Sequence, residues 1–396
     1  MTLPLADIRI VDFSQNVAAP SGAMLLADQG ADVIKVEPPG GGNSRTNTPA
    51  INGMTFYFMS WNRNKRSIMV DVTKDEGRAV THDLARWADV FITNSRLDAR
   101  RRHGYSYKDL AAVNSRLIYV SLTGYGEAGP EANLPGADIT IQARAGEIAA
   151  RRISDGPYPQ YTRLFHYDMG TAMLIAYGVM VAVHERQQTG KGQQVQVNLL
   201  QTALTLHTLQ MTHLAGSSER SPARPESLPI QYMCSDGRQL LSQTINTGRR
   251  WEEFLDAVRL EKLATDPRFD TLEKRQQGLA ELTQVIAQHF ATKPAAEWEA
   301  MFKRKELSAT VVKEIELDEV DEDPQVIAND MMIEFQQPEV GPMRATGQAV
   351  RLSAHAQERW LRLPAPTLGE HTAEILAQLG YTPQRIQALR GSGAVA

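Results

Sequence analysis

Asp168 is the residue of this sequence most readily interpreted as a reactive group. It lies in the segment Phe165–Leu174 (FHYDMGTAML), just ahead of a stretch rich in glycine and alanine that predicts a closely packed helix. A carboxylate there can cap the helix by accepting the amides of Gly170 or Thr171, which is worth about 1 kcal/mol. It can also act as a nucleophile in covalent catalysis. The local pattern favours the cap, the two roles are compatible, and amides at a helix start would lower the pKa of the carboxyl.

Several basic residues could bind phosphate or carboxylate groups. Arg96 follows the apolar run Val90–Thr93, at the carboxyl end of an expected strand, where open α/β sheets bind ligands. Arg45 follows the glycine run Gly40–Gly42, whose amides could hold a phosphate, although a flexible turn is the simpler interpretation. The run lacks the G-x-G-x-x-G pattern of dinucleotide-binding folds. The other basic clusters, which either pair with anions or form a solvated face, are Arg63, Lys65 and Arg66 and the run Arg100–Arg102.

The composition argues against several other kinds of site. The chain of 396 residues has one cysteine, Cys234, which rules out an internal disulfide and a cysteine-based zinc site. Its histidines are scattered, and neither an H-E-x-x-H zinc motif nor a G-x-S-x-G nucleophile elbow occurs. The net charge of −4 provides no basic field for nucleic acid. We therefore expect no metal site and no nucleic-acid partner.

The apolar stretches do not predict a membrane protein. The most apolar one, Met169–Val183, has about fifteen residues, against about twenty for a membrane span, and charged residues follow it. The N-terminus lacks the basic and apolar regions of a secretory signal. Because the lone cysteine also fits a reducing compartment, we expect a cytoplasmic protein without a membrane partner.

The first half of the chain predicts the elements that would position these residues. Short β-type runs alternate with helical patterns, which is typical of an α/β fold with a mostly parallel sheet. The expected strands are Ile8–Phe13, Val33–Glu37, Ser67–Val72, Val90–Thr93, Leu117–Thr123 and Gln194–Asn198. The expected helices are Ser21–Gln29, Lys74–Trp87, Tyr107–Val113 and the long apolar helix Met169–Gln188. Within the long helix, Gly170, Ala172 and Gly178 would allow a close approach to the sheet.

A change of character after Leu214 predicts a second domain. The segment Gly216–Ser227 is a polar loop rich in serine, proline and arginine, and a hairpin is expected beyond it around Ser235-Asp236-Gly237. We expect a Rossmann-like large domain at 1–214 and a smaller α+β domain at 228–314. A C-terminal segment at 323–396 would return to the large domain.

Motifs spread over nearly the whole chain carry a family resemblance that no single one of them would. They are Val11–Gly41, Phe58–Val72, Ala88–Arg96, Leu122–Pro130, His184–Leu204, Asp266–Thr271, Asp323–Val326 and Leu368–Tyr381. Together they resemble the class III CoA-transferases, also called the carnitine/bile-acid CoA-transferase family. Formyl-CoA transferase and α-methylacyl-CoA racemase belong to this family.

The resemblance implies a covalent role for Asp168. In the transferases an aspartate at this place attacks the donor thioester, forming an aspartyl anhydride and then an aspartyl–CoA thioester from which CoA passes to the acceptor acid. Such covalent catalysis conserves the energy of the thioester. Amides of a glycine-rich loop would stabilise the developing oxyanions. An acyl-CoA and a carboxylic acid are then the substrates, and no permanently bound cofactor is implied.

The resemblance also implies which residues contact CoA. The backbone at Val17 and Ala18 would lie beside the pantetheine, and Ala137 and Asp138 near the thioester. The adenine would lie beside the segment formed by Val70, Asp71, Val72 and Thr73. The remaining contacts would be Asn94, Ser95, Arg96, Arg102 and, as a phosphate partner, Arg45.

Two departures from the family pattern bear on the reaction. Where the racemase branch has Gly-His-Asp, this chain has Gly136-Ala137-Asp138, and an alanine cannot exchange a proton. Formyl-CoA transferase has glutamine at the place of Val17, so specificity for formyl-CoA and oxalate is not expected. A CoA-transferase is therefore the leading hypothesis. A racemase or isomerase, or a non-catalytic acyl-CoA-binding relative in which Asp168 is only a cap, remain the alternatives.

The resemblance implies an interlocked homodimer, in which each chain threads the other. Long linkers between the two domains would be needed, and Gly216–Ser227 and Ile315–Glu322 could provide them. The pair of acids does not follow from the sequence, because the substrate-facing loops Tyr158–Arg163 and Leu228–Asn246 match no rule that predicts an acyl group.

Overall fold

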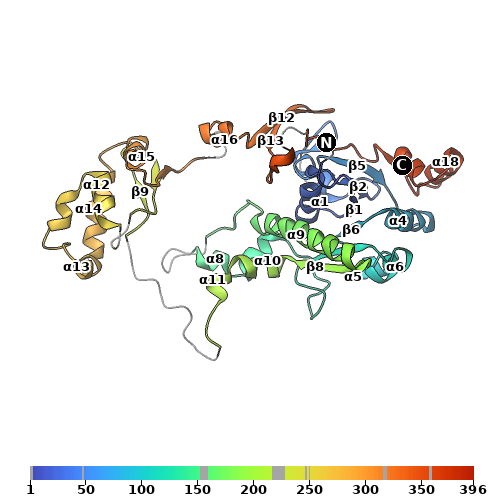
Figure 1. The fold of residues 1–396 in the computed structure, drawn as a ribbon, viewed down its shortest axis with the longest axis horizontal. Coiled ribbons are helices and arrows are strands. Elements are labelled where there is room, and N and C mark those ends of the chain that lie inside the picture. Colours follow the sequence, from blue (N-terminus) through green and yellow to red (C-terminus); the bar gives the residue numbers. More distant parts are fainter. Residues whose placement is uncertain are drawn as a thin grey trace. The chain divides into compact units, whose positions relative to one another are not determined.

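The chain folds into two compact units (Figure 1). The computed structural model describes residues 3–46, 49–151, 159–215, 228–245, 248, 250–314, 319–355 and 359–396. The large unit combines Met1–Thr212 with Asp330–Ala396, and the small unit is His213–Asn329. The expected linker Gly216–Ser227 lies outside the described residues, as do the first four positions of the second linker, 315–318, and position 158 of the first substrate-facing loop.

A six-stranded parallel sheet forms the centre of the large unit. Its strands are β1 (Arg9–Phe13), β2 (Asp32–Glu37), β5 (Lys65–Met69), β6 (Val90–Thr93), β7 (Ile118–Thr123) and β8 (Gln194–Asn198), arranged in the order β5-β2-β1-β6-β7-β8. Val11 pairs with Ile34 on one side and Phe91 on the other. This is the doubly wound order, in which ligands bind where the connections diverge, here between β1 and β6. The predicted α/β fold with a Rossmann-like sheet is confirmed.

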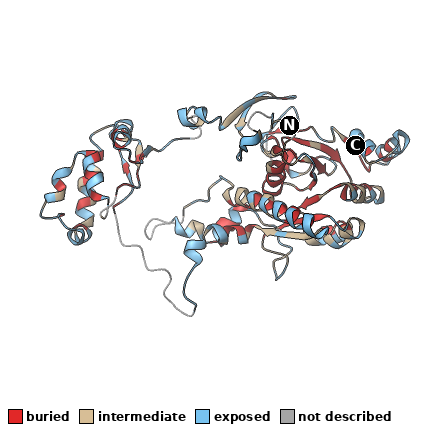
Figure 2. Ribbon diagram, in the orientation of Figure 1, coloured by how far each residue is buried: buried red, intermediate tan, exposed pale blue. Residues whose placement is uncertain are grey.

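Helices cover both faces of the sheet because the strands are apolar on both faces. Ile10 and Ile92 pack on one face with Ile175 and Val179 of α9 (His166–Thr189), where α1 (Ala18–Asp28) also lies. The opposite face is covered by α4 (Asp75–Trp87), α6 (Tyr107–Val113), α17 (Thr372–Gln378) and α18 (Pro383–Gly391). Figure 2 shows α1 and the inner strands of the sheet as mostly buried, while α9 alternates between buried and exposed residues.

Short elements complete the large unit. Around the sheet edge they are α2 (Asn43–Thr46), β3 (Ala50–Ile51), β4 (Met54–Thr55), α3 (Phe56–Met59), α5 (Leu97–Arg102), α7 (Asp138–Arg144) and α8 (Glu147–Ala150). Next to α9 and in the returning segment they are α10 (Leu199–Leu206), α11 (Thr208–Met211), β12 (Met332–Gln337) and β13 (Gly341–Thr346), which pair as an antiparallel hairpin, and a 3-10 turn at Ser353–His355.

The long helix begins earlier than predicted, at His166 instead of Met169. An ideal Cβ on Gly178 would come within 2.9 Å of Val195 in β8, so this glycine does allow a close approach to the sheet. The corresponding atom on Gly170 would instead meet Thr202 of α10 at 3.1 Å. The expectation for Gly170 was therefore wrong, because this part of the helix packs on another helix.

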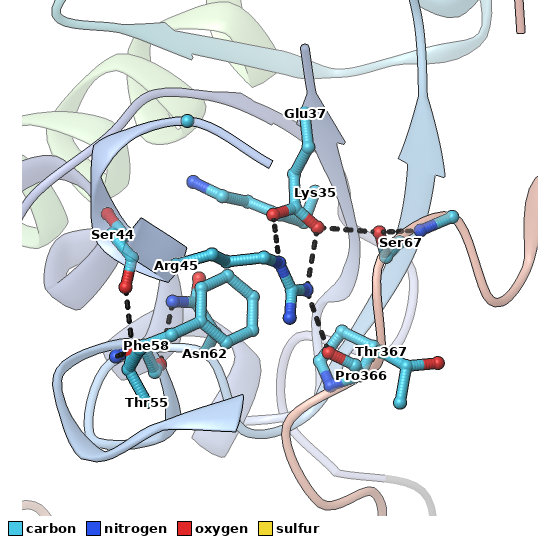
Figure 3. A network of polar contacts seen from close by, with 12 residues as sticks. Lys35, Glu37, Ser44, Arg45, Thr55, Phe58, Asn62, Ser67, Pro366 and Thr367 are labelled. Carbon is cyan, nitrogen blue, oxygen red and sulfur yellow. Dashed lines mark hydrogen bonds and ion pairs between the residues drawn. The ribbon is translucent and has the colours of Figure 1, made fainter. Parts of the chain in front are cut away.

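Buried ion pairs tie the strands and the returning C-terminal segment together. Asp12 at the end of β1 is fully buried and accepts hydrogen bonds from Lys65 (2.8 Å) and Lys35 (3.3 Å). Beside it, Arg45 donates to both carboxylate oxygens of Glu37 (2.6 and 2.9 Å) and to the carbonyl of Pro366 (2.9 Å), as Figure 3 shows. Charges paired in this way are tolerated inside a protein, where a lone charge is not.

The small unit combines a short antiparallel sheet with helices. Its strands are β9 (Gln231–Met233), β10 (Gln239–Leu241) and β11 (Thr310–Val311), and the hairpin predicted around Ser235-Asp236-Gly237 joins the first two. The helices are α12 (Trp251–Val258), α13 (Leu272–Gln277), α14 (Leu279–Phe290), α15 (Ala295–Arg304) and α16 (Pro324–Ala328), with a 3-10 turn at Glu261–Thr265. Phe254, Phe290 and Trp298 fill its core.

No helix among the described residues combines the length and apolarity needed to cross a membrane.

Candidate active site

A cavity of about 680 Å³ lies in the large unit, where the connections of the sheet diverge. It is lined by residues that follow the carboxyl ends of β1, β6 and β7, among them Gln15, Asn94 and Gly124, and by the first residues of α1. Asp168, in the first turn of α9, also lines it. The candidate nucleophile thus shares one cavity with the ligand-binding edge of the sheet.

Asp168 is not the cap of its helix, so that prediction was wrong. The N-cap residue is Phe165, in the left-handed conformation (φ 50°, ψ 35°), and Asp168 lies within the first turn. Its side chain is half-buried, and its carboxylate accepts no hydrogen bond from the described part of the chain. The carboxylate is therefore not engaged in holding the helix.

Asp138 supplies the cap in its place, from the start of α7. Its Oδ2 accepts the backbone amides of Tyr167 (2.8 Å) and Asp168 (3.0 Å), and its Oδ1 accepts the side-chain amide of Gln142 (2.6 Å). Gln142 in turn bonds to both backbone groups of Thr162 (2.9 Å each). Asp138 is 3% exposed, and both of its carboxylate oxygens accept hydrogen bonds.

The pKa of Asp168 is raised, not lowered as expected from the helix amides. Burial and, after it, the nearby charge of Asp138 raise the pKa of Asp168 from 3.8 to about 7. Both causes disfavour the ionised carboxylate. Asp168 consequently exchanges its proton near neutral pH, and its ionised form is more basic than an ordinary carboxylate.

Tyr57 is another polar residue of the cavity, and no sequence pattern predicted its place there. It belongs to the short helix α3, and its ring meets that of Phe165 edge to face at 6.2 Å between centroids. Burial and the charge of Asp168 raise the pKa of Tyr57 to about 12. The phenol therefore keeps its proton at neutral pH and is available as a hydrogen-bond donor. Its place beside Asp168 depends on contacts between segments far apart in sequence, which no local pattern reveals.

Side chains from two other segments, the residue after β6 and α2, hold the loop between β1 and α1. Asn94 accepts the amide of Gln15 (3.0 Å) and donates to the Gln15 carbonyl (2.7 Å), while Ser44 accepts the amide of Asn16 (3.0 Å). Asn16 adopts a positive φ of 67°, which asparagine tolerates better than most residues. This loop leads into α1, whose first residue, Ala18, lines the cavity, and the free amides at a helix start favour partial negative charge.

Seven of the predicted CoA contacts line this one cavity. They are Val17, Ala18, Asn94, Ser95, Arg96, Ala137 and Asp138. Arg96 is exposed and has no ion-pair partner within the described ranges, so its guanidinium is open to an anion.

The other predicted contacts do not line the cavity. Val70 forms a bridge with Val395, and Asp71 bonds to Thr73 through its carboxylate, which places Val70 to Thr73 after the edge strand β5. Arg102 is exposed at the end of α5.

Arg45 has a structural role instead of the expected one. Its guanidinium lies 3.6 Å from the ring centroid of Phe58 and is bound to Glu37 and to the Pro366 carbonyl, as described above (Figure 3). Because this side chain is buried and paired, Arg45 is not proposed as a phosphate ligand.

The basic residues between Arg63 and Arg66 form specific ion pairs, not a solvated face. Arg63 binds Asp28 (2.7 Å), Lys65 binds Asp12 and Arg66 binds Asp32 (2.8 Å). Across the described ranges, no group of three or more histidine, cysteine, aspartate or glutamate side chains could hold a metal ion.

Comparison with known proteins identifies the family to which the chain belongs. Residues 5–372 match the family described as CoA-transferase family III. The chain belongs to this family. The resemblance that the motifs predicted is confirmed, and the protein is a CoA-transferase that uses CoA thioesters.

Individual relatives extend over nearly the whole chain. The chain is 28% identical to (R)-2-hydroxy-4-methylpentanoate CoA-transferase of Clostridioides difficile, with 99% of each chain covered. It is 31% identical to succinyl-CoA:glutarate CoA-transferase of Mus musculus, covering 99% of this chain and 90% of the relative. Its fold is similar to that of a CAIB/BAIF family protein from Brucella suis, with a TM-score of 0.82 at 30% identity over 96% of this chain and all of the other.

Proposed function

We propose that this CoA-transferase moves CoA from an acyl-CoA to a carboxylic acid through covalent intermediates on Asp168. The observation that carries the proposal is the state of the Asp168 carboxylate. It faces the cavity, it accepts no hydrogen bond from the described residues, and its pKa is raised to about 7. A carboxylate with these properties is a stronger nucleophile than an ordinary aspartate.

The first half of the reaction transfers CoA to the enzyme. An Asp168 oxygen attacks the carbonyl carbon of the donor thioester, the carbon–sulfur bond breaks, and CoA leaves as a thiolate. The thiolate then attacks the Asp168 carbonyl carbon of the mixed anhydride, and the donor acid leaves as a carboxylate. An aspartyl–CoA thioester remains, and no net proton is consumed.

The second half repeats these steps with the acceptor. The acceptor carboxylate attacks the Asp168 carbonyl carbon and releases CoA thiolate, which then attacks the acceptor's carbonyl carbon in the new anhydride. The acceptor leaves as its CoA thioester, and Asp168 regains its free carboxylate. Both halves need a cavity that limits water, because anhydrides and thioesters hydrolyse.

Neighbouring groups are suited to stabilise the charges that develop. The protonated phenol of Tyr57 is a donor in the cavity that contains Asp168, and Val17 and Ala18, at the start of α1, also line this cavity. The first amides of a helix have no acceptor within the helix. Donors fixed in advance stabilise an oxyanion more strongly in a confined site than in water. Arg96 is suited to an anionic group of CoA, because its charge is exposed and unpaired within the described chain.

The distal part of CoA is assigned on the family resemblance alone. We propose that the adenine end reaches Val70 to Thr73 and Arg102, outside the cavity. On the same basis we propose an interlocked homodimer, with domains at 1–214 and 228–314 and a returning segment at 323–396. A monomeric mass in light scattering would contradict the homodimer.

A two-base racemase is not proposed for this chain. Ala137 lines the cavity immediately before Asp138, and its methyl group can neither accept nor donate a proton. Absence of solvent deuterium at the α-carbon of an acyl-CoA during active transfer is the expected result.

Trapping the intermediate tests the covalent role. The protein would be incubated with succinyl-CoA or acetyl-CoA, treated with hydroxylamine and digested, and the peptide containing Asp168 examined by mass spectrometry for an aspartyl hydroxamate. Asp168→Ala is expected to lose at least about 1,000-fold in kcat and to give no hydroxamate. Asp256→Ala, an exposed residue of the small unit, is the matched control. Full transferase activity in Asp168→Ala would refute the proposal.

A further inference from the structure

Two carboxylates meet at the start of α9, and only one of them has hydrogen-bond partners. Asp138 accepts the amides of Tyr167 and Asp168 with a single oxygen, at 2.8 and 3.0 Å. Asp168 lines the same cavity without a described hydrogen bond to its carboxylate. In many helices the side chain of the N-cap residue accepts such amides, but the N-cap residue of α9 is Phe165, which has no side-chain acceptor.

We propose that Asp138 is a positioning residue for the transfer reaction: by occupying the first amides of α9, it fixes the backbone of Asp168 and leaves the Asp168 carboxylate free to face the substrate. This inference rests on the proposed role of Asp168 as nucleophile. It changes the role of Asp138 from a thioester contact to a support of the reacting group.

The surroundings of Asp138 hold its side chain in a fixed position, as a positioning residue requires. Its second oxygen accepts the Gln142 side chain at 2.6 Å, and Gln142 is fixed by both backbone groups of Thr162. Asp138 is also the first residue of α7, so it lies at the N-termini of two helices at once. Both helix starts favour a negative charge at this position, although the side chain is only 3% exposed.

The backbone before Asp168 depends on this contact. Phe165 adopts the left-handed conformation, and no side chain of the entering segment caps the helix. A non-glycine residue in that conformation is held by its surroundings. The two hydrogen bonds to Asp138 are the side-chain contacts described for the first amides of α9.

Several other titratable or charged groups surround this helix start. Tyr57 of α3 and Arg96 share the cavity with Asp168. On the side of α8, His166 bonds to Glu147 (2.7 Å), which Arg151 also approaches (3.6 Å). On the side of α10, the Tyr167 hydroxyl bonds to His207 (2.9 Å). Asp138 differs from all of these because its carboxylate binds the Asp168 backbone directly.

Asp138→Asn separates the charge of Asp138 from its shape. The amide oxygen of asparagine can still accept a backbone amide of α9, but the negative charge beside Asp168 is removed. Because a less basic carboxylate is a weaker nucleophile, kcat is expected to fall while KM for the acyl-CoA changes little. The acid limb of the pH profile should move to lower pH. Asp138→Ala removes the hydrogen bonds as well, and its kcat should fall on the order of 100-fold, as for a misplaced reacting group.

A titration of Asp168 by ¹³C NMR provides a readout that does not need turnover. Protein labelled at the aspartate side-chain carboxyl carbons would be titrated, with Asp168→Asn used to assign the resonance. The wild-type resonance should titrate near pH 7, and in Asp138→Asn it should titrate at lower pH. Circular dichroism and thermal unfolding would establish that both variants are folded.

The possible outcomes distinguish this inference from the proposed function. An unchanged titration point together with an unchanged kcat in Asp138→Asn would overturn the inference. Equal activity of Asp138→Ala and wild type would do the same. If instead Asp168→Ala keeps full activity, the nucleophile assignment falls, whereas the NMR titration still reports whether Asp138 acts on Asp168.

Discussion

Asp12 and Asp168 are two buried or half-buried carboxylates near the same edge of one sheet, and their surroundings are opposite. Asp12 lies between Lys35 and Lys65 and has no exposed surface. Although burial opposes its charge, the two lysines and the hydrogen bonds from Lys65 and Ser14 hold the pKa of Asp12 below its ordinary value. Asp168 has a second carboxylate as its neighbour, and its pKa rises to about 7.

The difference teaches that burial alone does not give a carboxylate its role. Paired with cations, as at Asp12 and as at Glu37 beside Arg45 (Figure 3 shows the second pair), the charge holds strands and loops together. The Asp168 carboxylate lies beside another acid and accepts no described hydrogen bond, so its ionised form is disfavoured and therefore more reactive. The first arrangement stabilises the fold, whereas the second lowers its stability for the sake of chemistry.

The largest effect is expected when the paired carboxylate is removed. Asp12→Ala leaves two buried lysines without their shared partner, and it should lower the free energy of unfolding of the large unit by about 3–5 kcal/mol. Urea unfolding followed by circular dichroism measures this loss. Asp75→Ala on the exposed start of α4 is a control expected to change little. A loss below about 1 kcal/mol for Asp12→Ala would contradict the comparison.

The pH dependence of the reaction should reveal the unpaired carboxylate. Because Asp168 must be ionised to attack and its pKa is about 7, kcat/KM should rise with pH and level off above neutrality. At pH 5 the value should be about 100-fold below the plateau. Initial rates with a fixed acyl-CoA and acceptor between pH 5 and 9 provide the measurement. A profile that is flat down to pH 5 would show that Asp168 titrates as an ordinary aspartate.

A smaller effect is expected on stability when Asp168 loses its charge. Its pKa is raised from 3.8 to about 7 in the folded chain, so the folded state holds a proton that the unfolded chain has released between these values. The wild type should therefore lose stability as the pH rises from about 4 to about 7.

Asp168→Asn removes this cost and should gain about 1–2 kcal/mol at pH 8, after allowance for screening by water in the cavity. The gain should shrink toward pH 4, which unfolding at both pH values would test. A variant less stable than wild type at pH 8 would mean that the Asp168 carboxylate has stabilising partners.

Local patterns predicted the sheet well because its strands are short apolar runs. The strands Val90–Thr93 and Gln194–Asn198 were predicted with the bounds they have, and β2 was predicted to within one residue. The edge strand was predicted too late in the chain: β5 ends at Met69, and the next residues, Val70 and Asp71, contact Val395 and Ala394. A contact between segments so far apart in sequence cannot be predicted from local residue patterns.

The same limit explains the errors at the site. Asp168 has the sequence context of a cap, but Asp138, thirty positions earlier on another helix, supplies the cap. Arg45 has the context of a phosphate ligand, but Glu37 and the Pro366 carbonyl bind it. The role of a charged residue thus depended on partners that only the folded chain brings near, whereas the family resemblance identified Asp168 itself.

In the large unit, residues near the C-terminus contact residues 45–70, and this arrangement has a consequence for how the chain folds during synthesis. Arg45 binds the Pro366 carbonyl, Ser67 accepts the Gly369 amide, and Val70 pairs with Val395 at the exposed side of β5. A chain leaving the ribosome cannot make these contacts until residues 366–395 have emerged, after the small unit has been produced. Until then the edge strand β5 is uncovered, and an uncovered edge is a template for pairing with other chains. The completion of the sheet is therefore a late event, and chains truncated before residue 366 would leave that edge open.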